Sequence, residues 1–214
     1  MLNDLITITP RHENAAKMIF NRILELRNQN SKEKLIISIS GEVGTGKSTV
    51  STALGLMLKK IDIRSKIMDL DDYYKNSPLE RKKWRLENGI TSIGYDEYDW
   101  GKVITNINDF MESKVSVMPC VDLITRYIDE LKTNFQGVDV LIINGLYSLK
   151  IDMADLKVFI EMTYGETGDA QKYNQKEEFD EYRKTVMQRE HEVVQSLKPN
   201  AEFFIDFDQS LFHL

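Results

Sequence analysis

The stretch GEVGTGKSTV at positions 41–50 carries the residue types that bind phosphate, at the spacing G-x-x-x-x-G-K-S. Glycines let successive backbone N–H groups turn inward around a phosphate, and a helix that begins at the end of the loop adds positive charge. In this pattern Lys47 faces the β and γ phosphates and Ser48 offers a hydroxyl to Mg²⁺. The predicted nucleotide-binding residues are Gly41, Glu42, Val43, Gly44, Thr45, Gly46, Lys47, Ser48 and Thr49.

A group of acidic residues follows the next apolar run, in the stretch MDLDDYYK. If this stretch is a strand, Asp69 and Asp71 share a face, whereas Asp72 points elsewhere or begins the loop. Ligands of open parallel sheets lie at the carboxyl ends of the strands, which would place these carboxylates beside the phosphate loop. A carboxylate there could accept a proton from a hydroxyl or hold a Mg²⁺-bound water. The alternative is that the aspartates cap the following helix or face solvent.

Alternating strands and helices must position these groups. Apolar runs of strand length predict strands at 35–40, 65–70, 115–118, 139–144, 156–162 and 202–206. Apolar stripes at helical spacing predict helices at 12–29, 47–61, 103–111 and 174–196. Strands that alternate with helices imply a parallel sheet covered on both faces. The predicted fold class is therefore α/β, a three-layer α/β/α arrangement of the P-loop NTPase type.

The length of 214 residues favours a single domain over 1–214. The helix at 12–29 would serve as packing or as the surface of a homodimer. Gly165 and Gly168 allow wide backbone angles, so the segment 164–178 is predicted to be a small lid.

Composition and charge exclude several classes of partner. The net charge of −6 argues against a general attraction to nucleic acid or to an anionic membrane. No apolar stretch is long enough to span a bilayer, and the first residues, MLNDLITITPRHENAA, lack a targeting pattern, so we expect a cytoplasmic protein. The single cysteine, Cys120, is expected to be a small buried side chain. His12, His191 and His213 match no zinc spacing, and we expect ordinary surface roles for them.

Three further motifs follow the phosphate loop in order. They are Asp71-Asp72-Tyr73-Tyr74, Tyr98-Asp99-Trp100 and Pro119-Cys120-Val121-Asp122. With the loop, they resemble the uridine kinase and phosphoribulokinase family of small-molecule kinases, and the resemblance runs from about residue 35 to 206. It implies that ATP, with Mg²⁺, donates its γ-phosphoryl to a hydroxyl of a small nucleoside or sugar-like acceptor. The catalytic residues would be Lys47 and Asp71, with Asp71 as the base.

The resemblance also implies a set of acceptor-binding residues. Tyr74 would border the acceptor pocket, and the aromatic residues near Tyr98 would either hydrogen-bond a polyol or base or belong to the core. The predicted acceptor-side residues are Tyr74, Tyr98, Asp99, Asp122 and Arg126.

The sequence departs from the family pattern at several positions. Asn144 stands where the family usually has Glu, so a magnesium site of Ser48, Asp69 and Asn144 would take its charge from Asp69. Val121 and Ile128 replace a Tyr and an Arg of uridine kinases, which argues against uridine itself. The predicted lid has Lys172 and Lys176 but no arginine; Arg183 and Arg189 come later, and Arg183 could equally form an ion pair with nearby glutamates.

Two alternatives to this hypothesis remain at the level of sequence. One is an adenylylsulfate kinase-like enzyme, which would share the loop and an early aspartate. The other is a nucleotide-binding regulatory protein with weak or no transfer activity, in view of Asn144 and the lid without arginine.

Overall fold

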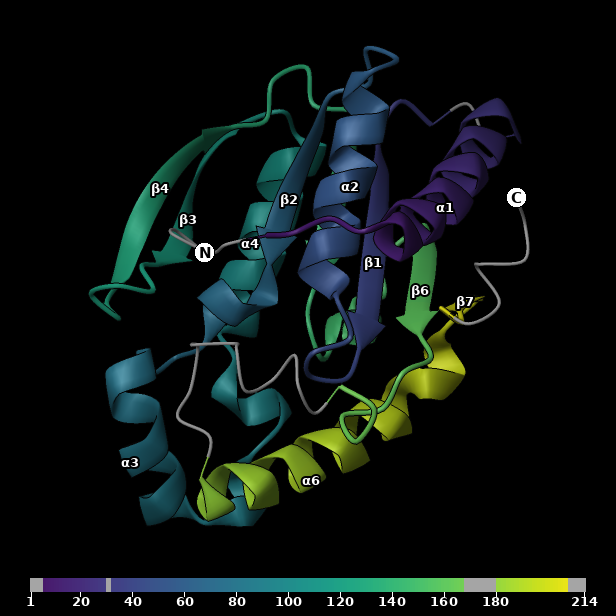
Figure 1. Cartoon of the computed structure of the whole chain (residues 1–214). Helices are drawn as coiled ribbons and strands as arrows, with labels where there is room; N and C mark the ends of the chain where they lie inside the picture. The colour runs from purple at the N-terminus through teal and green to yellow at the C-terminus, as the bar shows by residue number, and fades with distance from the viewer. Residues whose placement is uncertain (1–5, 30–31, 168–179, 208–214) are drawn as a thin grey trace.

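The computed structural model of the chain describes residues 6–29, 32–167 and 180–207 (Figure 1). Its centre is a five-stranded sheet in the order β2-β5-β1-β6-β7, in which all neighbouring strands are parallel. The strands are β1 (Leu35–Gly41), β2 (Ser65–Asp69), β5 (Val140–Asn144), β6 (Leu156–Ile160) and β7 (Phe203–Ile205). The predicted parallel sheet is confirmed.

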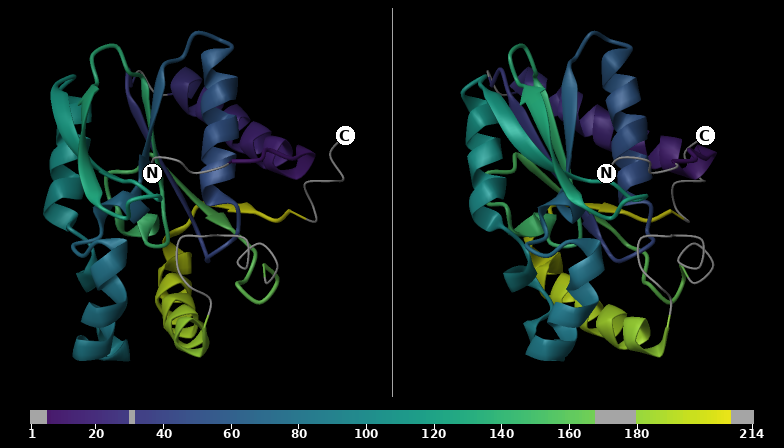
Figure 2. Two further views of the ribbon diagram at one scale, coloured as in Figure 1. Left: turned by 60° about the vertical axis from the view of Figure 1, so that its left-hand side comes forward. Right: turned by 90° about the vertical axis from the view of Figure 1, so that its left-hand side faces the viewer.

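Helices cover both faces of this sheet, so the three-layer fold class is confirmed. Helices α1 (Pro10–Gln29) and α2 (Lys47–Lys59) lie on one face, and α4 (Trp100–Met111) lies on the other (Figure 2). The side chains of β1 alternate accordingly, because Ile37 packs with α1 and α2 whereas Ile36 packs with α4. All of β1 is buried, as expected for a central parallel strand.

A second, two-stranded sheet differs from the prediction. The strand expected at 115–118 extends over β3 (Val115–Val121) and pairs antiparallel with β4 (Ile128–Asn134), outside the parallel sheet. We did not predict β4, because its sequence IDELKTN is mostly polar and exposed and shows no alternation.

Helix α3 (Pro78–Asn88) was also missed. Its buried positions carry Arg81 and Arg85, whereas Leu79 and Leu86 are exposed, so it has no apolar stripe that would indicate a helix. Together with α6 (Glu181–Leu197), α3 lies beyond the arrowheads of β1 and β6, at the carboxyl edge of the sheet (Figure 1).

The predicted helix at 174–196 and the predicted lid at 164–178 extend into residues that the structure does not describe. Helix α6 is described from Glu181, after Asp180, whose side chain accepts a hydrogen bond from the backbone N–H of Arg183 at 2.7 Å. Lys172 and Lys176 lie outside the described residues, and the single domain with a lid stays a prediction. In the part of the chain that is described, no helix is long and apolar enough to cross a membrane.

Short 3-10 helices connect the elements around the carboxyl edge. They are η1 (Leu70–Tyr73), η2 (Ile90–Ser92), η3 (Tyr95–Glu97), η4 (Ser148–Lys150) and η5 (Lys198–Asn200).

Candidate active site

The loop between β1 and α2 has the geometry of an anion-binding loop. Gly46 caps α2 with φ 83°, in the left-handed region that glycine tolerates best. At Gly41, φ is 151° and an added Cβ would lie 3.0 Å from Thr45 Oγ1, so a side chain there would be crowded as well as strained. The backbone therefore turns around a space at the N-terminus of α2, where backbone N–H groups and the helix dipole favour a phosphate.

Lys47 lies over this loop. Its Nζ donates a hydrogen bond to the backbone carbonyl of Glu42 at 2.6 Å, and the Thr45 hydroxyl donates to the same carbonyl at 3.0 Å. The ammonium group is therefore held close to the turn that would surround a phosphate.

Three oxygen-bearing side chains meet at the carboxyl ends of β2 and β5. Asp69 and Asn144 end their strands as register partners, and the Ser48 hydroxyl donates a hydrogen bond to Asn144 Oδ1 at 3.3 Å. Asn144 is buried, and its Nδ2 has no hydrogen-bond partner among the described residues. Hydroxyl, carboxylate and amide oxygens suit Mg²⁺, which keeps several waters and takes phosphate oxygens as further ligands. The three residues thus fit the predicted magnesium site.

Asp69 and Asp71 do not share a strand, so the predicted alternation is wrong. The strand ends at Asp69, which caps η1 by accepting a hydrogen bond from the Asp71 N–H at 3.0 Å. Asp72 is buried and accepts the Val121 N–H at 2.7 Å, and burial raises the pKa of its carboxyl group. Asp69 therefore caps η1 through one of its carboxylate oxygens. Asp71 is half-buried and follows directly after this edge of the sheet.

The predicted acceptor residues Tyr74 and Tyr98 lie together. They form an isolated antiparallel bridge, and their ring centres are 4.2 Å apart. Tyr98 is 1% exposed and also contacts Tyr147, with ring centres 5.4 Å apart. Tyr98 thus belongs to a cluster of buried hydrophobic side chains, as the alternative to an acceptor role predicted. In this cluster its ring packs against the ring of Tyr74.

The other predicted acceptor residues have local structural roles. Asp99 caps α4 by accepting the Lys102 N–H at 3.0 Å. Asp122 accepts the Ile124 N–H at 2.7 Å and so shapes the turn between β3 and β4, in which Arg126 is exposed with φ 62°. The assignment of Asp99, Asp122 and Arg126 to an acceptor stays a prediction.

Comparison with known proteins decides the family. The model of the phosphoribulokinase/uridine kinase family matches residues 36–165, from β1 to the segment after β6. The chain belongs to this family.

The chain is similar to curated uridine kinases and to solved structures of small-molecule kinases. A uridine kinase from Ureaplasma parvum serovar 3 is 30% identical over 140 residues, which span 62% of this chain and 64% of that protein. The structure of a possible uridine kinase from Bacillus stearothermophilus covers 90% of this chain and 98% of its own, with a TM-score of 0.59 and 17% identity. The D-glycerate 3-kinase from Cryptococcus neoformans covers 94% and 97%, with a TM-score of 0.62 and 13% identity.

A network of ion pairs lies beside Tyr74. The sequence analysis did not predict this network. Arg85 bonds Glu97 at 2.6 Å and Glu190 at 3.3 Å, and Arg183 bonds Glu190 at 3.1 Å. The Arg81 guanidinium lies 3.5 Å from the centre of the Tyr74 ring. The ion-pair interpretation of Arg183 is confirmed.

The signal for this network was present in the sequence. Arg81 and Arg85 are four residues apart, which places them on one face once α3 is recognised as a helix. The structure thus brings the buried Arg81 and Arg85 of α3 and the partly buried Arg183 of α6 to the carboxyl edge, whereas we predicted no role for the arginines of α3.

Glu42 connects the phosphate loop to two other elements of the family fold. Its buried carboxylate accepts hydrogen bonds from Tyr164 N–H at 2.7 Å, Gln195 Nε2 at 2.6 Å and His191 Nδ1 at 2.8 Å. The loop is therefore tied to the segment after β6 and to α6. Nothing in the motif predicted this, because Glu42 occupies a variable position of the pattern.

The expected surface role is wrong for His12, which is buried and whose Nε2 would lie 2.9 Å from a Cβ added to Gly46. His191 is partly exposed and forms a hydrogen bond with the Glu42 carboxylate. His213 lies outside the described residues. Cys120 is buried, as predicted.

Proposed function

We propose that the chain is an ATP-dependent kinase that transfers the γ-phosphoryl group of ATP to a hydroxyl of a small nucleoside or sugar-like metabolite. The observation that supports this proposal is that the predicted site residues follow one another along the carboxyl edge of the sheet. The glycine-capped start of α2 is followed across the sheet by Ser48, Asn144 and Asp69, and then directly by Asp71. Membership of a family named for two kinases supports the same proposal.

In this proposal, the residues of the site mainly position groups and neutralise charge. The loop N–H groups and Lys47 bind the phosphates. Ser48, Asp69 and Asn144 hold Mg²⁺, which, when bound, offsets the charge of the phosphates. Asp71 accepts the proton of the attacking hydroxyl. The protein would act in the cytoplasm on a small molecule.

The test is ADP release from ATP in the presence of Mg²⁺ and each of a panel of nucleosides, sugars, polyols and adenylylsulfate. We expect one class of hydroxylated acceptor to stimulate ADP release and Lys47→Ala to abolish it. Lys59→Ala, at the other end of α2, is the matched control and should keep wild-type activity. ATP binding without any stimulated ADP release would favour a regulatory protein, and stimulation by adenylylsulfate alone would favour that kinase class.

A further inference from the structure

Strand β4 is the open edge of the small antiparallel sheet. Among the described residues it pairs only with β3, and it lies at the periphery of the molecule in Figure 1. An open edge presents a row of backbone N–H and C=O groups that can pair with a further strand. Five of the seven residues of β4 are exposed; they are Asp129, Glu130, Leu131, Lys132 and Asn134.

Hydrogen bonds at the two ends of the hairpin show which backbone groups face outward. The Asp122 N–H donates to the carbonyl of Tyr127 at 3.1 Å, and the Phe135 N–H donates to the carbonyl of Lys114 at 3.0 Å. Residues that bond the neighbouring strand alternate in an antiparallel pair, so the odd-numbered residues of β4 bond β3. The backbone groups of the even-numbered residues therefore face the open edge; these residues are Ile128, Glu130, Lys132 and Asn134.

The charges of the edge residues select one antiparallel pairing between two copies of this strand. A twofold axis at Leu131 places Glu130 opposite Lys132 of the second copy, and the symmetry repeats this opposite-charge pair. An axis one residue earlier would place two glutamates opposite each other, and an axis one residue later would place two lysines so. The charges of β4 therefore favour the register centred on Leu131.

Both charged side chains are available for such a pair. Among the described residues, Lys132 has no ion-pair partner, and Glu130 pairs only with Lys102, whose Nζ lies 3.6 Å from Glu130 Oε1. The side chains of Lys102 and Glu130 are 35% and 70% exposed, and a surface pair of this kind adds little stability. Glu130 can therefore exchange this partner for a lysine on a second copy.

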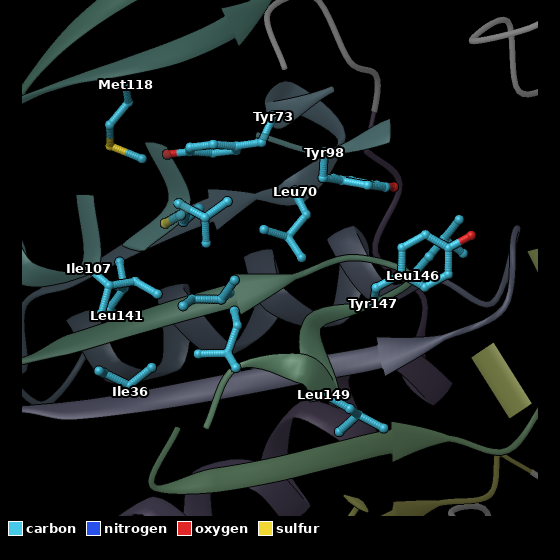
Figure 3. Close-up of a cluster of buried hydrophobic side chains, with 14 of the residues drawn as sticks. Ile36, Leu70, Tyr73, Tyr98, Ile107, Met118, Leu141, Leu146, Tyr147 and Leu149 are labelled. Atoms are coloured by element: carbon cyan, nitrogen blue, oxygen red, sulfur yellow. The ribbon is translucent and has the colours of Figure 1, made fainter. Parts of the chain in front are cut away.

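Apolar side chains on the other face of the hairpin would meet at the same axis. Met118 extends from β3 into the cluster of buried side chains (Figure 3), and its register partner on β4 is Leu131. Directly opposite residues share a face, yet Leu131 is 51% exposed. With the axis at Leu131, the two leucines face each other as a non-hydrogen-bonded pair, in which side chains lie closest. An apolar row would thus run from Met118 of one copy to Met118 of the other.

We infer that two copies of the chain form a symmetric dimer through the edges of their β4 strands, which gives a four-stranded antiparallel sheet across the axis. This inference goes beyond the proposed kinase function and does not depend on it. Helix α1, the other surface considered for a homodimer, buries its apolar side chains against α2 and the sheet. One pair of strands covers a small area, so we expect a dimer that dissociates in the micromolar range.

Reversal and exchange of the two charges test the register. Sedimentation equilibrium at micromolar protein concentrations measures the dissociation constant of the dimer. We expect Lys132→Glu, which places glutamates opposite each other, to raise this constant at least about tenfold. The double variant Glu130→Lys/Lys132→Glu restores the opposite-charge pairs and should return the constant to near the wild-type value. Lys66→Glu, the same change at an exposed position of the edge strand β2, is the matched control and should leave it unchanged.

Cysteine substitutions test the position of the axis by a second measurement. Opposite residues of a non-hydrogen-bonded pair have Cα atoms about 4.5 Å apart, which is within the range of a disulfide. Leu131→Cys should therefore form a covalent dimer with oxidised glutathione, visible on a non-reducing gel. In Lys132→Cys the new thiol lies opposite Glu130 instead, so this variant should stay a single chain. The native Cys120 is buried and is common to both variants.

Three outcomes would overturn the inference. A monomer at every concentration would mean that the charged side chains protect this edge from pairing. A dimer that Lys132→Glu does not weaken, or that the double variant does not restore, would meet through another surface. Equal cross-linking of Leu131→Cys and Lys132→Cys would exclude the axis. Thermal midpoints near the wild-type value are expected for all variants, because the substituted positions are exposed.

Discussion

Asp71 and Asp72 are neighbours in the chain, but the fold gives their carboxylates different environments. Asp72 is buried and holds the backbone of β3 through the Val121 N–H. Asp71 is half-buried and follows the cap of η1, beside the edge where Ser48 and Asn144 meet. A base needs contact with the acceptor, which the buried Asp72 carboxylate lacks, so at this scale the structure favours Asp71.

Replacing Asp71 by Asn should separate chemistry from binding. Asp71→Asn keeps the size of the side chain and removes its basicity, so we expect kcat to fall by about 10²–10⁴ while ATP affinity stays unchanged. Acceptor-stimulated ADP release and ATP titration measure the two quantities. Asp96→Asn, at an exposed aspartate of η3, is the control. Wild-type kcat in Asp71→Asn would exclude it as the base.

Asn144 offers a test of the magnesium site. Asn144→Asp adds a carboxylate opposite its register partner Asp69, where two like charges repel unless a cation lies between them. We expect a lower thermal midpoint without Mg²⁺, recovery when Mg²⁺ is added, and a lower Mg²⁺ concentration for half-maximal ADP release. Asn134→Asp on the exposed strand β4 is the matched control. The same response to Mg²⁺ in both variants would argue against a metal at Asn144.

At the scale of elements, the sequence predicted the helices and strands whose apolar residues recur at regular spacing. The central strands β1, β5 and β6 and helices α1, α2 and α4 were predicted because each buries apolar side chains at regular positions. Helix α3 and strand β4 were not, since one buries arginines and the other exposes most of its side chains. The candidate site divides in the same way, because the phosphate loop is a local motif, whereas the ion pairs of Arg85 with Glu97 and Glu190 form only through tertiary structure.

Helix α6 supports the phosphate loop without belonging to it. His191 and Gln195, one turn apart on α6, both donate hydrogen bonds to the Glu42 carboxylate. A carboxylate only accepts hydrogen bonds, so His191 carries its proton on Nδ1 in this contact. The position of the loop therefore depends on an element about 150 residues away in sequence.

This link predicts an effect on ATP from a residue that is outside the loop. His191→Ala removes one donor from the buried Glu42 carboxylate and leaves that charge less well paired, so we expect the Kd for ATP to rise about tenfold. A direct titration with ATP measures it. Glu192→Ala changes the adjacent exposed side chain on α6 and should leave the Kd unchanged. Equal affinities in all three proteins would show that α6 does not hold the loop.

At the scale of the whole molecule, the family match is smaller than the folded core. It covers 36–165, yet α1 lies before it and α6 and β7 after it. The side chains of α1 nevertheless fill the cluster between α2 and the sheet; those fully buried are Ala15, Ala16, Ile19 and Ile23. His12 on the same helix packs against Gly46 of the phosphate loop. Helix α1 is therefore part of the core that positions the site.

This role of α1 predicts how the chain responds to truncation. Without α1, the apolar face of α2 and several buried strand residues would meet water, so a truncated chain that begins at Glu33 should not unfold cooperatively. The point variant Ile19→Ala should lower the free energy of unfolding by about 2–5 kcal/mol, the usual cost of such a cavity. Lys17→Ala, exposed on the same helix, should change it by less than about 0.5 kcal/mol. Denaturant unfolding measures all four proteins, and a truncated chain with the wild-type midpoint would show that α1 folds independently of the sheet.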